Sequence, residues 1–144
     1  MIETLFDQLG KIEGAASNLR GALFELIVGH IAMLQESGSI DVGKTLTISA
    51  EERYEIDVFC VTAETVRLIE CKGYAPTHKI DAEELESWIR TKARRLHKNY
   101  RSQPSLQNRE FRFEFWTSGG FTEDALQLAE AVSKETSRYT VKLM

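Results

Sequence analysis

The feature that most constrains the fold of this chain is a pair of apolar stretches joined by a short polar connection. Residues 54–61 and 66–72 are rich in β-branched, aromatic and other apolar side chains. The four residues between them, Thr62-Ala63-Glu64-Thr65, are few enough to form a tight turn. We therefore expect a β-hairpin.

A turn centred between Ala63 and Glu64 sets the register of this hairpin. It pairs Val61 with Val66, Phe59 with Leu68, Asp57 with Glu70 and Glu55 with Lys72. All eight side chains then share one face of the sheet, because alternate residues of a strand point the same way. The half of this face near the turn is apolar and the other half is charged, so we expect the hairpin to run from a core into a charged patch.

The charged patch places two carboxylates side by side. Opposed side chains in a hairpin have β-carbons about 5 Å apart, and like charges placed so are destabilising. A divalent cation neutralises them, and magnesium is typically held by one or two carboxylates with water and substrate phosphate. Asp57 and Glu70 are therefore candidate metal ligands, and Lys72 could orient or deprotonate an attacking water. The alternative is a solvated strand end with a Glu55 to Lys72 ion pair.

A further carboxylate lies in an apolar stretch upstream. Between Gly21 and Leu34 the only polar side chains are Glu25 and His30, so we expect a helix buried on most sides. A buried carboxylate needs a partner or a metal. Glu25 is thus a candidate ligand of an outer or second metal, with an ion pair to a lysine or arginine as the alternative. His30 falls on the leucine stripe of this helix, and we expect a core histidine.

These residues resemble the PD-(D/E)XK nucleases, whose restriction-endonuclease-like core has a hairpin carrying an aspartate and then a Glu-x-Lys. Asp57, Glu70 and Lys72 occupy those places, although Ile56 precedes the aspartate where the motif has proline. The stretch Gly21-Ala22-Leu23-Phe24-Glu25 resembles the Gly-x-x-Phe-Glu opening of Mrr-like members. The resemblance extends from Gly21 to the end of the chain.

The resemblance implies a metal-dependent nuclease that hydrolyses phosphodiester bonds, of DNA more than of RNA, in defence or restriction. Glu25, Asp57, Glu70 and Lys72 would be catalytic, with Mg²⁺ or Mn²⁺ held by Asp57, Glu70, the Cys71 carbonyl and Glu25. Lys72 would position water while the metal stabilises charge on the phosphate. Mrr-like nucleases come first, nuclease domains of CRISPR ancillary effectors second and junction resolvases third. Catalytically silent modules that bind partners also use this fold.

The remaining sequence predicts an α/β domain over residues 1–144. We expect helices over 2–9 and 13–35, a strand over 41–49, the hairpin, a helix capped by Asp81 and running to Arg101, a strand over 111–116, a helix capped by Thr122 and running to Lys134, and a strand over 139–143. The last two strands form a parallel crossover. The order α-β-β-β-α-β-α-β matches a restriction-endonuclease-like core, a central mixed sheet flanked by helices.

The helix after the hairpin carries a concentration of positive charge. Its second half contains Arg90, Lys92, Arg94, Arg95, Lys98 and Arg101 with no acid among them. We expect a buried stripe of Leu85, Ile89, Ala93, Leu96 and Tyr100, and an opposite, phosphate-contacting face of Arg90, Arg94, His97, Lys98 and Arg101. Lys92 flanks the stripe and is the candidate for an auxiliary basic role at the site. The alternative is a solvated face whose polarity suits the helix dipole.

The overall charge limits how such a protein could bind nucleic acid. The 22 acids outnumber the 18 lysines and arginines, for a net charge of −4, so the domain is not broadly basic. We expect binding to depend on a homodimer or on another domain or subunit. Cys60 and Cys71 lie far out of register, which favours free thiols and a reducing, cytoplasmic location. We expect no membrane association, since no apolar run is long enough to span a bilayer.

Overall fold

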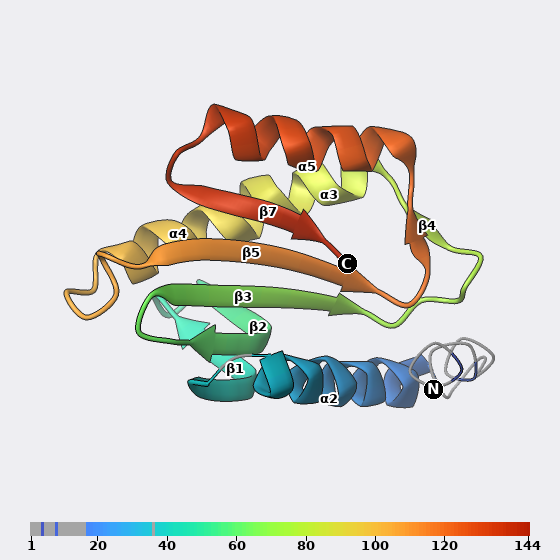
Figure 1. Ribbon diagram of the computed structural model, residues 1–144, viewed down its shortest axis with the longest axis horizontal. Coiled ribbons are helices and arrows are strands. Elements are labelled where there is room, and N and C mark those ends of the chain that lie inside the picture. Colours follow the sequence, from blue (N-terminus) through green and yellow to red (C-terminus); the bar gives the residue numbers. More distant parts are fainter. Residues whose placement is uncertain (1–3, 5–7, 9–16, 36) are drawn as a thin grey trace.

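The computed structural model describes residues 4, 8, 17–35 and 37–144, and it shows a mixed sheet between two layers of helices (Figure 1). The sheet has five strands in the order β1-β2-β3-β5-β7. They are β1 (Ser39–Thr47), β2 (Arg53–Val61), β3 (Thr65–Lys72), β5 (Glu110–Thr117) and β7 (Tyr139–Leu143). β1, β2 and β3 are antiparallel neighbours, whereas β3, β5 and β7 run parallel.

Helices cover both faces of this sheet. On one face lies α2 (Ser17–Gln35), and on the other lie α3 (Ala82–Trp88), η2 (Ile89–Ala93), α4 (Arg94–Arg101) and α5 (Glu123–Glu135) (Figure 1). The predicted order α-β-β-β-α-β-α-β is confirmed. Two short strands that we did not predict, β4 (Lys79–Ile80) and β6 (Gly120–Phe121), form a separate parallel pair. Within the described part of the chain, no helix is long and apolar enough to cross a membrane.

The ends of the elements follow local sequence signals. The Asp81 side chain accepts a hydrogen bond from the N–H of Glu84 and caps α3, and Thr122 caps α5 through the N–H of Ala125, as predicted. β7 has its predicted bounds, while β1 begins two residues earlier than expected. Except for Thr4 and Gln8, the predicted helix over 2–9 and the first residues of the one from Glu13 lie outside the described residues.

Two hydrophobic clusters hold the layers together. The larger one lies between the sheet and α3 to α5, and it includes the whole predicted stripe of Leu85, Ile89, Ala93, Leu96 and Tyr100. The prediction that His97 lies on the exposed face is wrong. His97 is buried beside the rings of Phe111 and Tyr139, because the start of β5 and the start of β7 reach the side of α4 that carries it.

The prediction that α2 is buried on most sides is also wrong. Its fully buried side chains form one line, four residues apart, of Phe24, Val28 and Ala32, and Ile31 packs beside them partly buried. His30 and the leucine stripe that contains it are exposed rather than in the core. The physical reason is the position of α2 in an outer layer, where a helix can bury only the side that meets the sheet.

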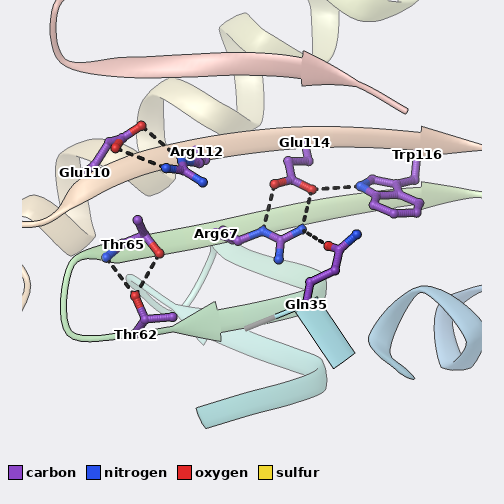
Figure 2. A network of polar contacts seen from close by, with 8 residues as sticks. All are labelled: Gln35, Thr62, Thr65, Arg67, Glu110, Arg112, Glu114 and Trp116. Atoms are coloured by element: carbon purple, nitrogen blue, oxygen red, sulfur yellow. Dashed lines mark hydrogen bonds and ion pairs between the residues drawn. The ribbon is translucent and has the colours of Figure 1, made fainter. Parts of the chain in front are cut away.

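A buried polar network lies on the α2 side of the sheet (Figure 2). Arg67 of β3 donates to Glu114 of β5 through Nε at 2.8 Å and Nη2 at 2.9 Å, and Trp116 donates to the same carboxylate. Arg67 also reaches the side-chain oxygen of Gln35 at the end of α2. The network therefore ties the strand that carries Glu70 to its parallel neighbour and to α2.

Candidate functional site

The candidate site is built around Asp57, whose side chain takes the place of a backbone hydrogen bond between β2 and β3. Its Oδ2 accepts a hydrogen bond from the N–H of Cys71 at 2.7 Å, and the side chain is only 9% exposed. On the other side of β2, the ladder with β1 skips the position of Asp57 opposite Gly43, whose φ is +70°. Asp57 thus lies where regular pairing of β2 is interrupted on both edges.

This interruption corrects part of the predicted register. Val61 pairs with Val66 and Phe59 with Leu68, as expected, but the ladder ends at Val58 and Ile69. The predicted backbone pairs of Asp57 with Glu70 and of Glu55 with Lys72 are therefore wrong. The physical reason is that the Asp57 carboxylate takes the Cys71 N–H that would otherwise serve the ladder.

Side-chain alternation is broken at the same place. Ile56 and Phe59 both pack in the core on the α3 to α5 side, whereas Val58 packs against α2. A regular strand would place Ile56 and Val58 on one face. The strand therefore turns about its own axis near Asp57, which a count of alternate residues cannot show.

Glu70 lies at the end of β3 between two lysines. Its side chain is buried, and Oε1 lies 2.9 Å from Nζ of Lys72. Oε2 accepts a hydrogen bond from Nζ of Lys92 on the helix above the sheet. Lys92 therefore contacts the candidate acid Glu70, and its auxiliary role stays a prediction. Lys72 pairs with Glu70 in place of the predicted alternative partner Glu55.

A π-helical turn carries Lys92 to the sheet. The N–H of Arg94 bonds to the carbonyl of Ile89, five residues earlier, so η2 accommodates one extra residue in its turn. The insertion lies next to Lys92 and between two ordinary helical segments. The sequence carries no local signal for it, because side-chain periodicity predicts one uninterrupted helix there.

Burial and neighbouring charges shift the pKa values of the acid and the lysine at the site. Burial, together with repulsion from Glu70, raises the pKa of Asp57 to about 6, although the Cys71 N–H and Lys92 oppose the shift. Burial lowers the pKa of Lys72, but attraction to Glu70 and Asp57 outweighs it, so the net pKa of Lys72 is raised. Lys72 is therefore a cation at neutral pH, suited to positioning an anion or a water rather than to accepting a proton.

Glu25 joins the same charged region from α2. Burial raises its pKa first, and repulsion from Glu55 and Glu70 raises it further. The N-terminal half of α2 is held there by Arg20, whose Nε donates to the carbonyl of Gly73 at 2.5 Å. A β-carbon at Gly73 would lie 3.2 Å from the α-carbon of Gly21 and from the carbonyl oxygen of Arg20, so the close approach of the helix to the end of β3 depends on glycine at position 73.

The oxygen atoms of the site provide only part of the ligand set that a hard divalent cation such as Mg²⁺ needs. Asp57 and Glu70 are buried carboxylates with mutual repulsion, which a magnesium ion relieves. The Cys71 thiol is buried on the α2 side and its pKa is raised by burial, so only the main-chain carbonyl of Cys71 is available as a ligand. Within the described residues, no three or more His, Cys, Asp or Glu side chains are grouped to hold a metal ion.

The other predicted basic residues lie away from this site. Arg90 pairs with Glu86, and Arg95 pairs with Glu52. Arg94, Lys98 and Arg101 are exposed on the outer side of α4. A cavity of about 650 Å³ at the starts of β5 and β7 includes Arg101, but it lies at the other end of the strands from the acids. The predicted nucleic-acid face is thus solvent-accessible, and only Lys92 joins the acids.

Comparisons with known proteins bear on the fold. No protein-family model and no curated protein sequence matches the chain. The fold resembles the crystal structure of a protein of unknown function, AF1548, with a TM-score of 0.59 and 18% identity over 85% of this chain. It also resembles the MspJI restriction endonuclease solved with a 27-mer oligonucleotide, with a TM-score of 0.51 and 15% identity over 97% of this chain.

The chain spans 57% of the first of these proteins and 28% of the second. At these identities the likeness concerns the fold, a central mixed sheet flanked by helices as in restriction endonucleases.

Proposed function

We propose that this chain is a metal-dependent nuclease domain that hydrolyses phosphodiester bonds, of DNA in preference to RNA. The observation that carries the proposal is the pair of buried carboxylates, Asp57 and Glu70, joined to Lys72 at the interrupted end of the hairpin. The likeness of the fold to MspJI, a restriction endonuclease solved with an oligonucleotide, supports it. Within nucleases, the Gly21 to Glu25 stretch favours an Mrr-like defence enzyme over a CRISPR ancillary effector, and either over a junction resolvase.

The residues of the site would act in distinct ways. Asp57, Glu70 and the Cys71 carbonyl would hold Mg²⁺ or Mn²⁺, which supplies Lewis acidity at the phosphate. Lys72, as a cation, would hold the attacking water or a phosphate oxygen in place. Lys92 would hold the Glu70 carboxylate in position, and Glu25 would accept hydrogen bonds from water at the outer edge of the site.

A catalytically silent module is the second candidate, and one observation favours it. Lys72 and Lys92 both contact the Glu70 carboxylate, so this buried acid is neutralised by the chain itself. A fold of this kind does not by itself imply activity. Such a module would bind a partner and use Glu70, Lys72 and Lys92 only to stabilise the hairpin end.

The test is a cleavage assay with purified protein and three variants. Wild-type protein, Lys72→Ala, Asp57→Asn and the control Lys142→Ala are incubated with supercoiled plasmid, single-stranded DNA and RNA in magnesium, manganese or chelator. Lys142 is an exposed lysine on β7, at a distance from the acids, so its removal matches the change of charge without touching the site. Calorimetry measures Mg²⁺ binding by the same proteins.

We expect metal-dependent cutting by the wild-type and control proteins, and none by Lys72→Ala or Asp57→Asn. Asp57→Asn should also weaken metal binding, whereas Lys72→Ala should retain it. Unchanged cutting by Lys72→Ala would refute the assignment of this lysine. Absence of both cutting and metal binding in the wild-type protein would favour the silent module.

A further inference from the structure

The outer side of α2 is apolar and exposed over its whole length. Leu19 is 58% exposed, Leu26 59% and Leu34 74%, and Leu23 and Met33 are exposed as well. These residues lie opposite the line that packs on the sheet. Figure 1 shows α2 as the outermost layer on its side of the molecule. Contiguous apolar patches on a soluble domain mark interaction surfaces.

The spacing of the exposed residues identifies the shape of the partner. Leu19, Leu23, Leu26, His30 and Met33 follow one another at intervals of four, three, four and three residues. This alternation is the seam of two packed helices, because a mean spacing of 3.5 residues keeps side chains facing a partner helix. The same alternation continues toward the N-terminus of the sequence through Ala16, Ile12, Leu9, Leu5 and Ile2.

The chemistry of the seam excludes a charged partner. The lysine, arginine and acidic side chains of α2 are limited to Arg20 and Glu25, and both lie at the site end of the sheet. Arg20 donates a hydrogen bond to the carbonyl of Gly73, and the charges of Glu70 and Lys72 act on the pKa of Glu25. No phosphate-binding group is therefore presented along the seam by the described residues of α2. An apolar helix with the same spacing is the complementary surface.

The exposed apolar area reaches the lower limit for association of two chains. The exposed leucine and methionine side chains of α2, Leu34 included, offer roughly 500 Å² per chain, or about 1,000 Å² for a pair, which is the least that a specific interface buries. Val42 of β1, which lies against Gly29 of α2, is exposed as well and adds to this area. A second copy of the chain presents an identical seam, and most soluble oligomers are symmetric pairs built from one surface used twice.

We infer that α2 is a homodimer interface, in which the seam from Leu19 to Met33 packs against the same seam of a second copy. The inference rests on the geometry of α2 and not on nuclease activity. His30 is the one polar side chain within the seam. A polar residue at such a position specifies the register of paired helices and lowers their affinity.

The test is sedimentation velocity of the full chain over a wide range of protein concentration. We expect a monomer–dimer equilibrium that Leu26→Glu weakens at least about a hundredfold, because each copy would bury a carboxylate in the seam. His30→Leu should strengthen the dimer, by roughly tenfold. The control is Leu126→Glu on α5, since Leu126 is 45% exposed and lies on the opposite side of the sheet; it should not change the equilibrium.

Thermal unfolding of each variant completes the test. Leu26 is more than half exposed in the single chain, so Leu26→Glu should leave the monomer folded. A wild-type protein that stays monomeric at every concentration overturns the inference. So does a dimer that Leu26→Glu leaves intact, and so does a monomer destabilised by this variant, which would mean that the chain covers its own α2.

Discussion

Replacing Asp57 by asparagine should stabilise the fold at neutral pH while it weakens metal binding. Asparagine has nearly the shape of the carboxyl group and can still accept the Cys71 N–H. It removes the negative charge that burial and Glu70 make unfavourable. A residue that lowers the stability of its own fold is expected at a site built for a ligand.

The magnitude follows from the pKa of Asp57. The value rises from 3.8 to about 6, so the folded protein holds the Asp57 proton more tightly than the unfolded chain does. Stability due to this proton is complete below the unfolded value and is lost as the pH rises through about 6. At about 1.4 kcal/mol for each tenfold change in proton affinity, the ionised carboxylate costs the folded state up to about 3 kcal/mol at pH 7 and above.

Urea denaturation in chelator, repeated between about pH 4 and pH 8, measures this cost. We expect Asp57→Asn to be more stable than wild type by about 1 to 3 kcal/mol at the upper end and equal to it at the lower end. Asp124→Asn, an exposed acid in the first turn of α5, should instead lose a few tenths of a kcal/mol, roughly the dipole contribution. A gain that does not change with pH, or a loss at pH 8, would show that the buried charge is not destabilising.

The remaining predictions concern the supports of the site. Glu114→Gln should lower the free energy of unfolding by about 3 kcal/mol, because the buried Arg67 keeps its charge and loses its anionic partner. Replacing both residues by apolar ones should recover most of this loss, and urea titration of the two variants measures the difference. Lys92→Met should raise the pKa of Asp57 further, so any metal-dependent activity should need a higher pH, and a pH profile that does not move would contradict this. Gly119→Ala should destabilise the protein by about 1 kcal/mol or more, since its β-carbon would lie 2.1 Å from a backbone carbonyl; a thermal midpoint equal to wild type would refute it.

Much of the fold could be predicted because its signals are local. The turn after Val61 sets the first two pairs of the hairpin, and Asp81 and Thr122 cap the helices that follow them. The sequence also predicted in part which residues form the charged region. Asp57, Glu70 and Lys72 stand at the ends of the two hairpin strands, and Glu25 stands in an apolar helix before them. Their chemical roles stay predictions until cleavage is measured.

Other features could not be predicted because they depend on contacts between distant elements. The π-helical turn that brings Lys92 to Glu70 and the burial of His97 arise where the helix meets the sheet. The charged residues Arg67 and Glu114, each in the middle of an apolar strand, did carry a signal. A buried charge needs a partner, and only the parallel pairing of β3 with β5 shows that each is the partner of the other.

The sequence by itself determined the order of the elements, the hairpin turn and which side chains of α2 are apolar. Only the tertiary structure decided which of these side chains are buried, where the ladder ends at Asp57 and how the two lysines divide the oxygens of Glu70. The physical reason is that turns and caps are satisfied by residues near in sequence, whereas burial and charge pairing are set by whichever element packs alongside. A helix that is apolar on two sides can bury only one of them against a single sheet. In α2 the side with Phe24 and Val28 is buried, and the seam on the other side stays exposed.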